Sequence, residues 1–171
     1  MKALLVIDML RDFIDADGAL TTGSAGADIV DFIEEKIQEF RAKDFPIIYI
    51  CDNHKIDDKE FDMFPPHCIA GTEGSEIIER LEPEKEDMII TKRRYSAFFG
   101  TDLDLHLREK QIDEIYIVGV CTNICILYTA ADARNLGYKV NIYRDGVASF
   151  DKEAHNFALK ELKITLGCII L

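Results

Sequence analysis

The chain has 171 residues, of which 48% are apolar, and this is enough for one ordinary domain with a substantial buried core. Its 32 acidic residues outnumber the 20 basic ones, and the net charge of -12 disfavours nucleic acid and anionic membrane surfaces as partners. No cleavage-site pattern opens the sequence, and no apolar run approaches the ~18 residues of a membrane-spanning helix. We therefore expect a cytoplasmic chain, folded as a single domain over residues 1–171, that binds neither nucleic acid nor a membrane.

Five cysteines, an odd number, are spread along the chain without a C-x-x-C pair. In a chain that shows no sign of export, this distribution predicts free thiols in a reducing compartment. They are Cys51, Cys68, Cys121, Cys125 and Cys168.

The first half of the sequence predicts three strands and one helix. A compact apolar strand at 3–7 is followed by an amphipathic helix at 27–42. The apolar positions of that helix, at helical spacing, are Ile29, Ile33, Ile37 and Phe40. Further strands are predicted at 46–50 and 88–90. The stretch 52–75 between them holds two histidines and many acids without periodicity, and so long a loop in a compact domain is usually functional.

The second half predicts three helices that alternate with three strands. The helices are 101–110, 123–135 and 151–163, and the strands are 115–118, 139–143 and 168–170. This alternation predicts an α/β fold, a doubly wound, Rossmann-like, six-stranded and mainly parallel sheet with helices on both faces.

Each of these three helices carries a feature that needs weighing. In 101–110, every second residue from Leu103 is leucine, as in a strand, whereas Thr101-x-x-Asp104 resembles a capping box, and the α/β rhythm favours a helix. The stretch 123–135 is apolar almost all round and closed by Gly137, so we expect a buried helix. The helix at 151–163 follows a cap-like residue, Ser149 or Asp151.

Polar residues follow several predicted strands directly, at the edge where open parallel sheets bind ligands. They are Asp8, Asp52, His54, Lys92 and the segment 121–125. No GxGxxG or P-loop spacing occurs at these strand ends, so dinucleotides and nucleoside triphosphates lose their usual sequence support.

Cys125 is placed where a strand passes into a helix, and there unpaired N–H groups and the helix dipole favour a thiolate. A cysteine at this position is otherwise a small buried hydrophobe. The acid Asp8 and the cation Lys92 follow neighbouring strands and can converge on one thiol, which favours a reactive cysteine over a structural one.

A second constellation has metal-ligand chemistry. Asp52 and His54 point to the same side of an extended segment, and His67 follows thirteen residues after His54. One carboxylate oxygen and two imidazole nitrogens suit zinc, iron or manganese. Isolated D-x-H pairs are common, however, and the plain alternative for His67 is a loop histidine bonded to backbone.

Four motifs occur in order along nearly the whole chain. They are LLVIDMLRDF at 4–13, FPPHCIAGT at 64–72, KRRYSAF at 92–98 and GVCTNIC at 119–125. Together they resemble the isochorismatase-like cysteine hydrolases and, within them, the nicotinamidases. The resemblance implies an isochorismatase-like fold, hydrolysis of nicotinamide and related amides such as pyrazinamide, and a homo-oligomer.

The resemblance also implies roles for the residues. Cys125 is then the nucleophile, Asp8 the group that accepts and later donates the proton, and Lys92 the cation that steadies the thiolate. The backbone N–H groups of Cys121 and Cys125 form the oxyanion hole, aligned by a cis peptide bond between Val120 and Cys121.

A bound divalent metal, zinc with iron or manganese as alternatives, is a further implication. Its ligands by resemblance are Asp52, His54, His67 and, as an optional member, Glu60. The metal or its water would hold the pyridine nitrogen. The residues that would flank the substrate ring are Phe13, Phe64 and Tyr95.

Three other readings stay open. A carbamoyl-amidase type of hydrolase from the same superfamily would share Asp8, Lys92 and Cys125 but not the metal. A thiol-based redox or ligand-binding module would use Cys121 and Cys125 without catalysis, although CxxxC is not the redox-motif spacing. A zinc hydrolase would attack the amide with metal-activated water instead.

Overall fold

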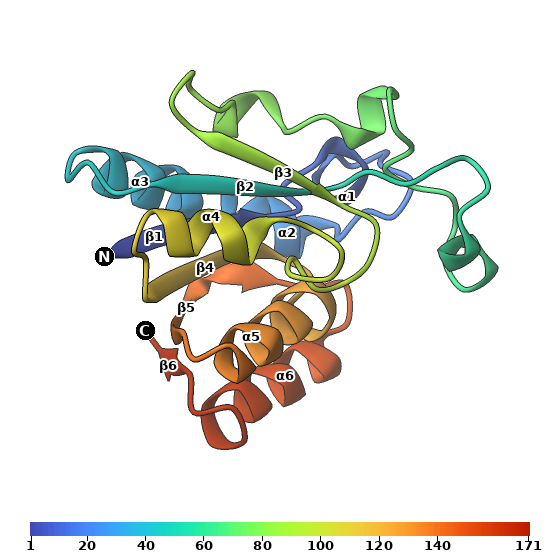
Figure 1. The fold of residues 1–171 in the computed structure, drawn as a ribbon. Coiled ribbons are helices and arrows are strands. Elements are labelled where there is room, and N and C mark those ends of the chain that lie inside the picture. Colours follow the sequence, from blue (N-terminus) through green and yellow to red (C-terminus); the bar gives the residue numbers. More distant parts are fainter.

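The computed structural model describes residues 1–171 as one six-stranded sheet with helices on both faces (Figure 1). All neighbouring strands are parallel, in the order β3-β2-β1-β4-β5-β6. The strands are β1 (Lys2–Ile7), β2 (Ile47–Asp52), β3 (Met88–Lys92), β4 (Glu114–Val120), β5 (Lys139–Ala148) and β6 (Ile169–Ile170). The predicted fold class is confirmed, and the sheet is parallel throughout.

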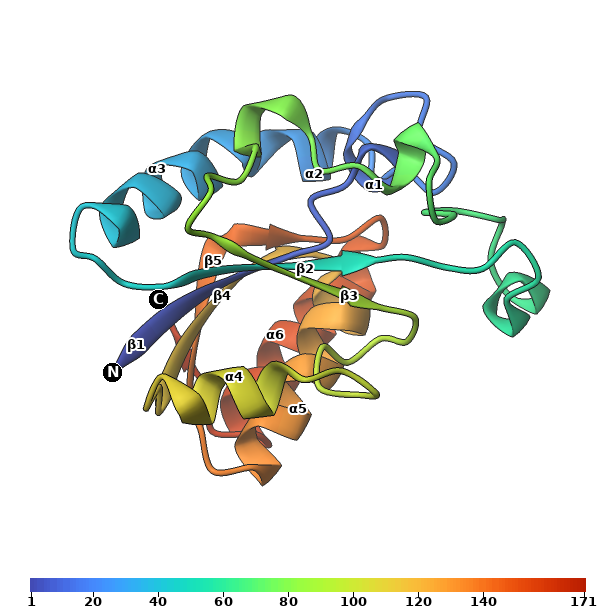
Figure 2. The same cartoon turned by 45° about the horizontal axis from the view of Figure 1, so that its top comes forward.

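Helices cover both faces of the sheet. The α-helices are α1 (Arg11–Ile14), α2 (Ser24–Asp28), α3 (Val30–Arg41), α4 (Leu103–Glu109), α5 (Leu127–Asn135) and α6 (Lys152–Ile164). Figure 2 shows α4, α5 and α6 on one face and α1, α2 and α3 on the other. The remaining turns are 3-10 helices η1 (Lys59–Asp62), η2 (Glu73–Ser75) and η3 (Glu79–Leu81), and a π-helical turn η4 (Thr122–Ile126). No helix combines the length and hydrophobicity that crossing a bilayer needs.

The central strand β1 is buried on both faces, which explains why its sequence is apolar at nearly every position. Leu5 and Ile7 pack in the cluster beneath α4, α5 and α6, whereas Leu4 and Val6 pack towards α3. The two faces of the sheet thus carry two separate hydrophobic clusters.

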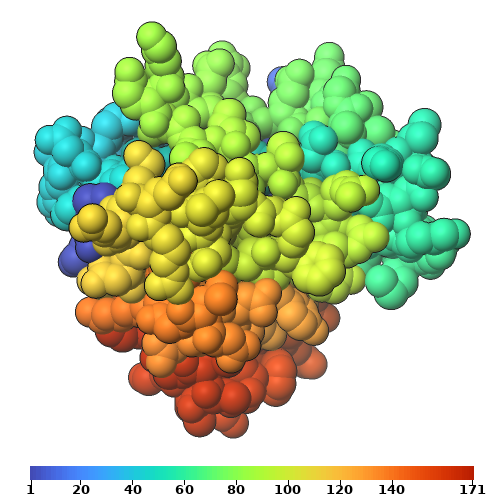
Figure 3. Space-filling view, viewed as in Figure 1, coloured from blue at the N-terminus to red at the C-terminus, as the bar shows by residue number.

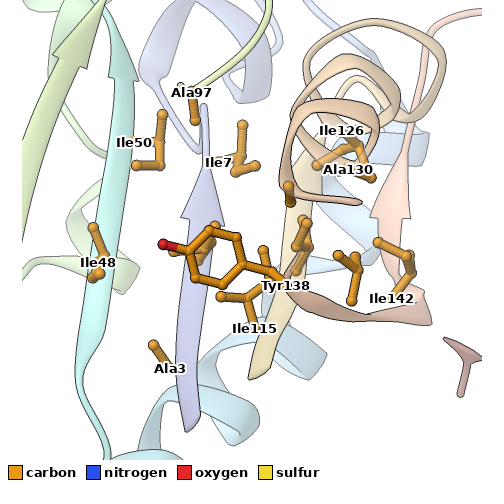
Figure 4. Packing of buried hydrophobic residues seen from close by; sticks show 14 of the residues in the cluster. Ala3, Ile7, Ile48, Ile50, Ala97, Ile115, Ile126, Ala130, Tyr138 and Ile142 are labelled. Carbon is orange, nitrogen blue, oxygen red and sulfur yellow. The ribbon is translucent and has the colours of Figure 1, made fainter. Parts of the chain in front are cut away.

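Tyr138 lies at the centre of the cluster on the α4–α6 face, near Ile115 and Ile142 (Figure 4). It is fully buried, and its hydroxyl donates a hydrogen bond to Asp104 Oδ1 at 2.7 Å. Its ring stacks on Phe98 with the centroids 5.8 Å apart. The one polar atom of this aromatic side chain therefore has a hydrogen-bond partner, which offsets the desolvation cost of its burial.

The helix predicted at 27–42 begins earlier than its periodicity indicated. Helices α2 and α3 follow each other with a break only at Ile29, so helical structure starts at Ser24. The four predicted apolar positions are nevertheless buried, which confirms the face that α3 turns to the sheet.

The helix predicted at 123–135 differs more. Its first turn is the π-helical η4, and α5 begins only at Leu127. The prediction that it is buried all round is wrong, because Tyr128 is 51% exposed. Only one side of α5, with Ala130 and Ala133, packs into the protein, and its opposite side faces solvent.

The ambiguous stretch 101–110 is helical, as the α/β rhythm favoured. Leu103 and Leu107 are buried and Leu105 is exposed, a helical rather than a strand pattern. The expected capping box is absent, because the Thr101 hydroxyl donates to the Ala97 carbonyl and accepts the N–H of Leu103 at 3.3 Å rather than that of Asp104. At the start of α6, Asp151 rather than Ser149 is the cap, since it accepts the Ala154 N–H at 2.8 Å.

Strands β2, β3 and β5 run further than predicted. Strand β5 extends to Ala148 and pairs again with β4 after a bulge between Ile117 and Gly119. Strands β2 and β3 extend to Asp52 and Lys92, which are register partners at the last rung of this pair. Two predicted site residues therefore belong to strands and are held by the sheet.

The segment between β2 and β3, teal to green in Figure 1, extends beyond the carboxyl ends of these strands and forms the margin of the molecule in Figure 3. It turns back on itself where His54 bridges Ile69 in parallel register. The His54 N–H donates to the Cys68 carbonyl at 2.9 Å, and the Ala70 N–H donates to the His54 carbonyl at 2.9 Å. This return brings His54 and His67 together.

Gly119 marks a close approach of β4 to β1. Its φ is +120°, and a Cβ there would lie 1.9 Å from the carbonyl oxygen of Ile7. We expect Gly119→Ala to lower the free energy of unfolding by ~3 kcal/mol or more, because the added methyl meets backbone and φ is unfavourable. Urea unfolding measures the loss.

Gly137→Ala is the matched control, since Gly137 has φ +90° and open space around its missing Cβ. Its expected loss is ~1–2 kcal/mol, the conformational cost alone. Equal losses in the two variants would show that the contact with Ile7 is unimportant.

Candidate active site

Asp8, Lys92 and Cys125, which lie far apart in the sequence, meet at the carboxyl ends of the strands. Lys92 Nζ lies 2.9 Å from Asp8 Oδ2 and 3.4 Å from Cys125 Sγ. It also lies 2.5 Å from Oδ1 of Asp52 on β2. Strand β2 lies between β1 and β3, so the expectation that Asp8 and Lys92 follow neighbouring strands is wrong. All of these side chains are buried. The structure thus brings an acid, a cation and a thiol together in one place.

The Asp8 carboxylate is held by a different partner on each oxygen. Its Oδ1 accepts the Asp52 N–H at 2.8 Å, and its own N–H donates to the Ile50 carbonyl at 2.8 Å. Oδ2 is buried and lies 2.9 Å from the Lys92 ammonium. A carboxylate oxygen of Asp8 lies within 4.8 Å of Cys125 Sγ. The group is therefore placed to exchange a proton with the thiol.

Cys125 is presented by the turn that leads from β4 into η4. The predicted cis peptide bond between Val120 and Cys121 is present. Within η4, the Thr122 hydroxyl lies 2.8 Å from His155 Nδ1, so α6 fixes this turn from behind. Cys121 and Cys125 are both buried, at 4% and 6% exposure.

Burial and neighbouring charges set the protonation states. Burial and, next, the Asp52 carboxylate raise the pKa of Asp8 to about 6, against the opposing effect of Lys92. Burial raises the pKa of the Cys125 thiol well above its usual value, and only the Lys92 ammonium opposes this. Burial lowers the pKa of Lys92, but Asp52 and Asp8 outweigh it, and the pKa lies well above its usual value. We expected the helix start to favour the thiolate, but burial outweighs this effect. The resting group is therefore a thiol.

A second cluster, the Asp-His-His cluster, consists of Asp52, His54 and His67. Its ligand atoms lie within 4.8 Å of one another, and all three residues are buried. The Nε2 atoms of His54 and His67 lie 3.6 and 4.0 Å from the same Asp52 oxygen. His54 Nε2 is buried without a hydrogen-bond partner. An orphaned imidazole nitrogen directed at a carboxylate, with a second imidazole nearby, fits a divalent cation.

Two further contacts complete this cluster. Glu60 is 8% exposed, and its Oε1 lies 3.9 Å from His54 Nε2, so the residue expected as an optional fourth ligand lies beside the cluster. His67 Nδ1 donates to the Pro65 carbonyl at 2.7 Å, which leaves the lone pair of Nε2 free. Burial lowers the pKa of His67, which favours the neutral imidazole that metals bind. Carboxylate oxygens and imidazole nitrogens suit zinc, iron and manganese alike.

Both clusters border one pocket. The three predicted ring-flanking residues, Phe13, Phe64 and Tyr95, line it. Asp52 and His67 of the Asp-His-His cluster also line it, together with Glu60 and, from the segment after β4, Cys121 and Cys125. The thiol and the Asp-His-His cluster therefore border the same pocket.

Three lining residues were not predicted, namely Leu20, Ile124 and Phe150. Ile124 lies within a recognised motif but carries no polar group. Leu20 belongs to a loop without periodicity, and no sequence signal marks it. Phe150 follows the end of β5 by two residues, so a search of strand ends for aromatic as well as polar side chains would have found it.

The model of the isochorismatase domain family matches residues 2–170. The chain belongs to the isochorismatase family. Among similar solved structures, a nicotinamidase/pyrazinamidase from Bacillus subtilis is 42% identical, with a TM-score of 0.94 and 99% of this chain and 98% of that chain covered. A pyrazinamidase of Pyrococcus horikoshii in complex with zinc is 34% identical, with a TM-score of 0.93 and coverage of 99% and 98%.

An N-carbamoylsarcosine amidase from Thermoplasma acidophilum is also similar, at 32% identity and a TM-score of 0.91, with 99% of this chain and 94% of that chain covered. The three structures share the fold of this chain at nearly full length. The chain is therefore an isochorismatase-family hydrolase. Which amide it cleaves has to be argued from the residues of its own site.

Proposed function

We propose that this hydrolase is a nicotinamidase that converts nicotinamide, and related heteroaromatic amides such as pyrazinamide, to the acid and ammonia. The observation that supports this most is that Asp8, Lys92 and Cys125 meet beside a pocket that the Asp-His-His cluster also lines. The 42% identity to the Bacillus subtilis nicotinamidase/pyrazinamidase supports the same assignment.

In the first half of the reaction, the Cys125 thiol gives its proton to Asp8 and the sulfur attacks the amide carbon. Asp8, with its pKa raised to about 6, then protonates the leaving nitrogen. Ammonia departs as the C–N bond breaks, and the acyl group stays on Cys125 as a thioester. Asp8 is then ionised again and ready for the second half.

In the second half, Asp8 takes a proton from water while the water oxygen attacks the thioester carbon. The C–S bond breaks, the acid is released, and Cys125 regains its proton from Asp8. The two halves use one carboxylate in both directions, and this requires a pKa near the working pH rather than the usual low value of an aspartate.

Lys92 and two backbone groups stabilise the charges that develop. The ammonium of Lys92, 3.4 Å from the sulfur, favours the thiolate as it forms, and its ion pair with Asp8 orients the carboxylate. We assign the oxyanion hole to the backbone N–H groups of Cys121 and Cys125, where fixed donors lower the barrier to a tetrahedral intermediate.

Asp52, His54 and His67, with Glu60 beside them, would hold a divalent metal ion. When bound, the ion supplies a Lewis-acid anchor for the pyridine nitrogen. The protein contributes the orientation, since the bond from His67 Nδ1 to the Pro65 carbonyl turns Nε2 towards Asp52. This accounts for a heteroaromatic substrate, because the ring nitrogen and the amide must reach two separate clusters at once.

Purified protein incubated with nicotinamide tests the proposal, with ammonia and nicotinic acid measured together. We expect equal amounts of both products and about one metal ion per chain. The second candidate is an N-carbamoyl amidase, which the similarity to the Thermoplasma acidophilum enzyme favours. Ammonia released from N-carbamoylsarcosine, with none from nicotinamide, would select that candidate.

Removal of the metal with a chelator is expected to lower kcat/KM for nicotinamide by ~100-fold or more, because a metal anchor is worth several kcal/mol. His54→Ala is expected to show the same loss and to bind no stoichiometric metal. His106→Ala, which changes a surface histidine on α4, is the control and should keep both properties. Full turnover by metal-free protein would contradict the assigned role of the Asp-His-His cluster.

We further propose that residues 1–171 act as one domain, since the family model spans residues 2–170 and both hydrophobic clusters share one sheet. The homo-oligomer stays a prediction. Gel filtration with light scattering, performed on the purified chain, measures it directly.

A further inference from the structure

Asp58 is a buried carboxylate next to the Asp-His-His cluster that the proposed reaction does not use. Its side chain is 3% exposed. It lies in the segment between β2 and β3, one residue before η1. An acid this well buried is seldom accidental, and each of its contacts has a definite partner.

The first contact is with His54. Asp58 Oδ2 lies 3.2 Å from His54 Nδ1. A carboxylate that already accepts from other donors can only accept here, so Nδ1 carries the hydrogen. The other nitrogen, Nε2, then keeps its lone pair, and this is the buried atom without a partner that faces Asp52 and Glu60. The contact thus fixes both the tautomer and the direction of the His54 ring.

The second contact is with Glu60. Asp58 Oδ1 accepts the Glu60 N–H at 3.0 Å and caps η1. The cap sets the backbone from which the Glu60 side chain reaches to 3.9 Å from His54 Nε2. One carboxylate therefore positions two neighbouring members of the candidate metal site.

The third contact is with Arg94. Its Nη1 lies 3.0 and 3.2 Å from the two oxygens of Asp58. Arg94 follows Lys92 by two residues, just beyond the end of β3. Asp58 therefore ties the segment that carries His54 and Glu60 to the strand that carries Lys92.

We propose that Asp58, held by Arg94, is a positioning residue that presets His54 and Glu60 for a divalent metal ion. The inference rests on the metal site of the proposed function. In carboxylate–histidine–metal arrangements of this kind, loss of the outer carboxylate weakens metal binding by about 10-fold to 100-fold. A purely structural cap on η1 would instead affect folding and leave metal affinity unchanged.

The test compares the zinc affinity of the unsubstituted chain, Asp58→Asn and Asp57→Asn, measured by competition with a chromophoric chelator. Asparagine keeps the size of the side chain and an oxygen that can cap Glu60, but not the charge. Asp57 is the adjacent exposed acid, without an ion pair, and serves as the matched control. We expect Asp58→Asn to bind zinc about 10-fold to 100-fold more weakly, and Asp57→Asn to bind it as the unsubstituted chain does.

The absorption spectrum of the cobalt-loaded protein adds a readout that a structural cap does not move. We expect the ligand-field bands of Asp58→Asn to shift or weaken, since His54 is no longer held in one orientation, and those of Asp57→Asn to stay unchanged. Zinc affinity of Asp58→Asn within twofold of the unsubstituted chain, with an unchanged cobalt spectrum, overturns the inference.

Arg94→Gln keeps the test decisive if Asp58→Asn does not fold. Arg94 is at the surface, with 46% of its side chain exposed. This variant therefore removes the ion pair with Asp58 without changing a buried side chain. We expect zinc affinity to fall severalfold, and an unchanged affinity overturns the inference. An unsubstituted chain that binds no zinc would overturn the metal site itself and this inference with it. If the unsubstituted chain binds zinc and the variants bind it equally well, only the inference about Asp58 is overturned.

Discussion

Replacement of Cys125 by alanine is expected to lower kcat for nicotinamide by at least ~10⁴-fold, because the sulfur forms the thioester bond of the proposed intermediate. The residue lines the pocket and lies 3.4 Å from Lys92 Nζ. Steady-state ammonia release measures the loss. Metal content and the far-UV circular dichroism spectrum should be unchanged, since Cys125 is a small side chain and does not belong to the Asp-His-His cluster.

Cys121→Ala is the matched control for this prediction. Cys121 lines the same pocket, and its assigned contribution is a backbone N–H that alanine retains. Its kcat is expected to stay within a fewfold of the unsubstituted value. If Cys125→Ala turned over nicotinamide at the unsubstituted rate, the attack would have to come from another nucleophile, and metal-activated water would become the better reading.

Asp8→Asn is expected to lower kcat by ~10³-fold or more, since an amide of the same shape can neither accept the thiol proton nor return it to ammonia. The Asp8 carboxylate lies 2.9 Å from Lys92, and Lys92 keeps a second carboxylate partner in Asp52. The ammonium therefore stays paired in the variant, and the fold should survive. Pre-steady-state kinetics would locate the loss in thioester formation.

Asp17→Asn, an exposed change on the same N-terminal segment, is the control and should be fully active. A loss of less than tenfold in Asp8→Asn, with metal content intact, would show that another group carries the proton. Asp52 would then be the first candidate, because it is the next carboxylate on Lys92.

The ends of the predicted strands pointed to the residues that the structure brings together. Asp8, Asp52, Lys92 and Cys125 each follow or end a compact apolar run, and in a parallel sheet such positions converge at one edge. The apolar periodicity of α3 likewise predicted its buried face. These features depend on neighbours in the sequence, and local pattern is sufficient to find them.

Other features depend on tertiary contacts and were missed. Leu20 and Phe150 reach the pocket from loops, where no period marks a residue as facing inward. The exposed side of α5 was taken for a buried one because apolar composition does not reveal which neighbours a helix has. Asp58 carries no motif, and of its three partners His54 and Glu60 are close in sequence, whereas Arg94 is brought to it by the fold.

Protonation states were the least predictable feature. The position of Cys125 at a helix start indicated a thiolate, whereas burial of the sulfur raises its pKa well above the usual value. Burial likewise raises the pKa of Asp8 to about 6. Together they describe a resting site with a thiol beside a carboxylate poised to take its proton, and this pairing follows from burial rather than from the order of residues.

Acid quenching of the enzyme during its first turnover of nicotinamide, followed by mass spectrometry of its peptides, tests the account most directly. We expect one nicotinoyl group on the peptide that contains Cys125, labile to hydroxylamine as a thioester is. Nicotinic acid formed in that turnover while Cys125 stays unmodified, or an acyl group found on a different residue, would contradict it.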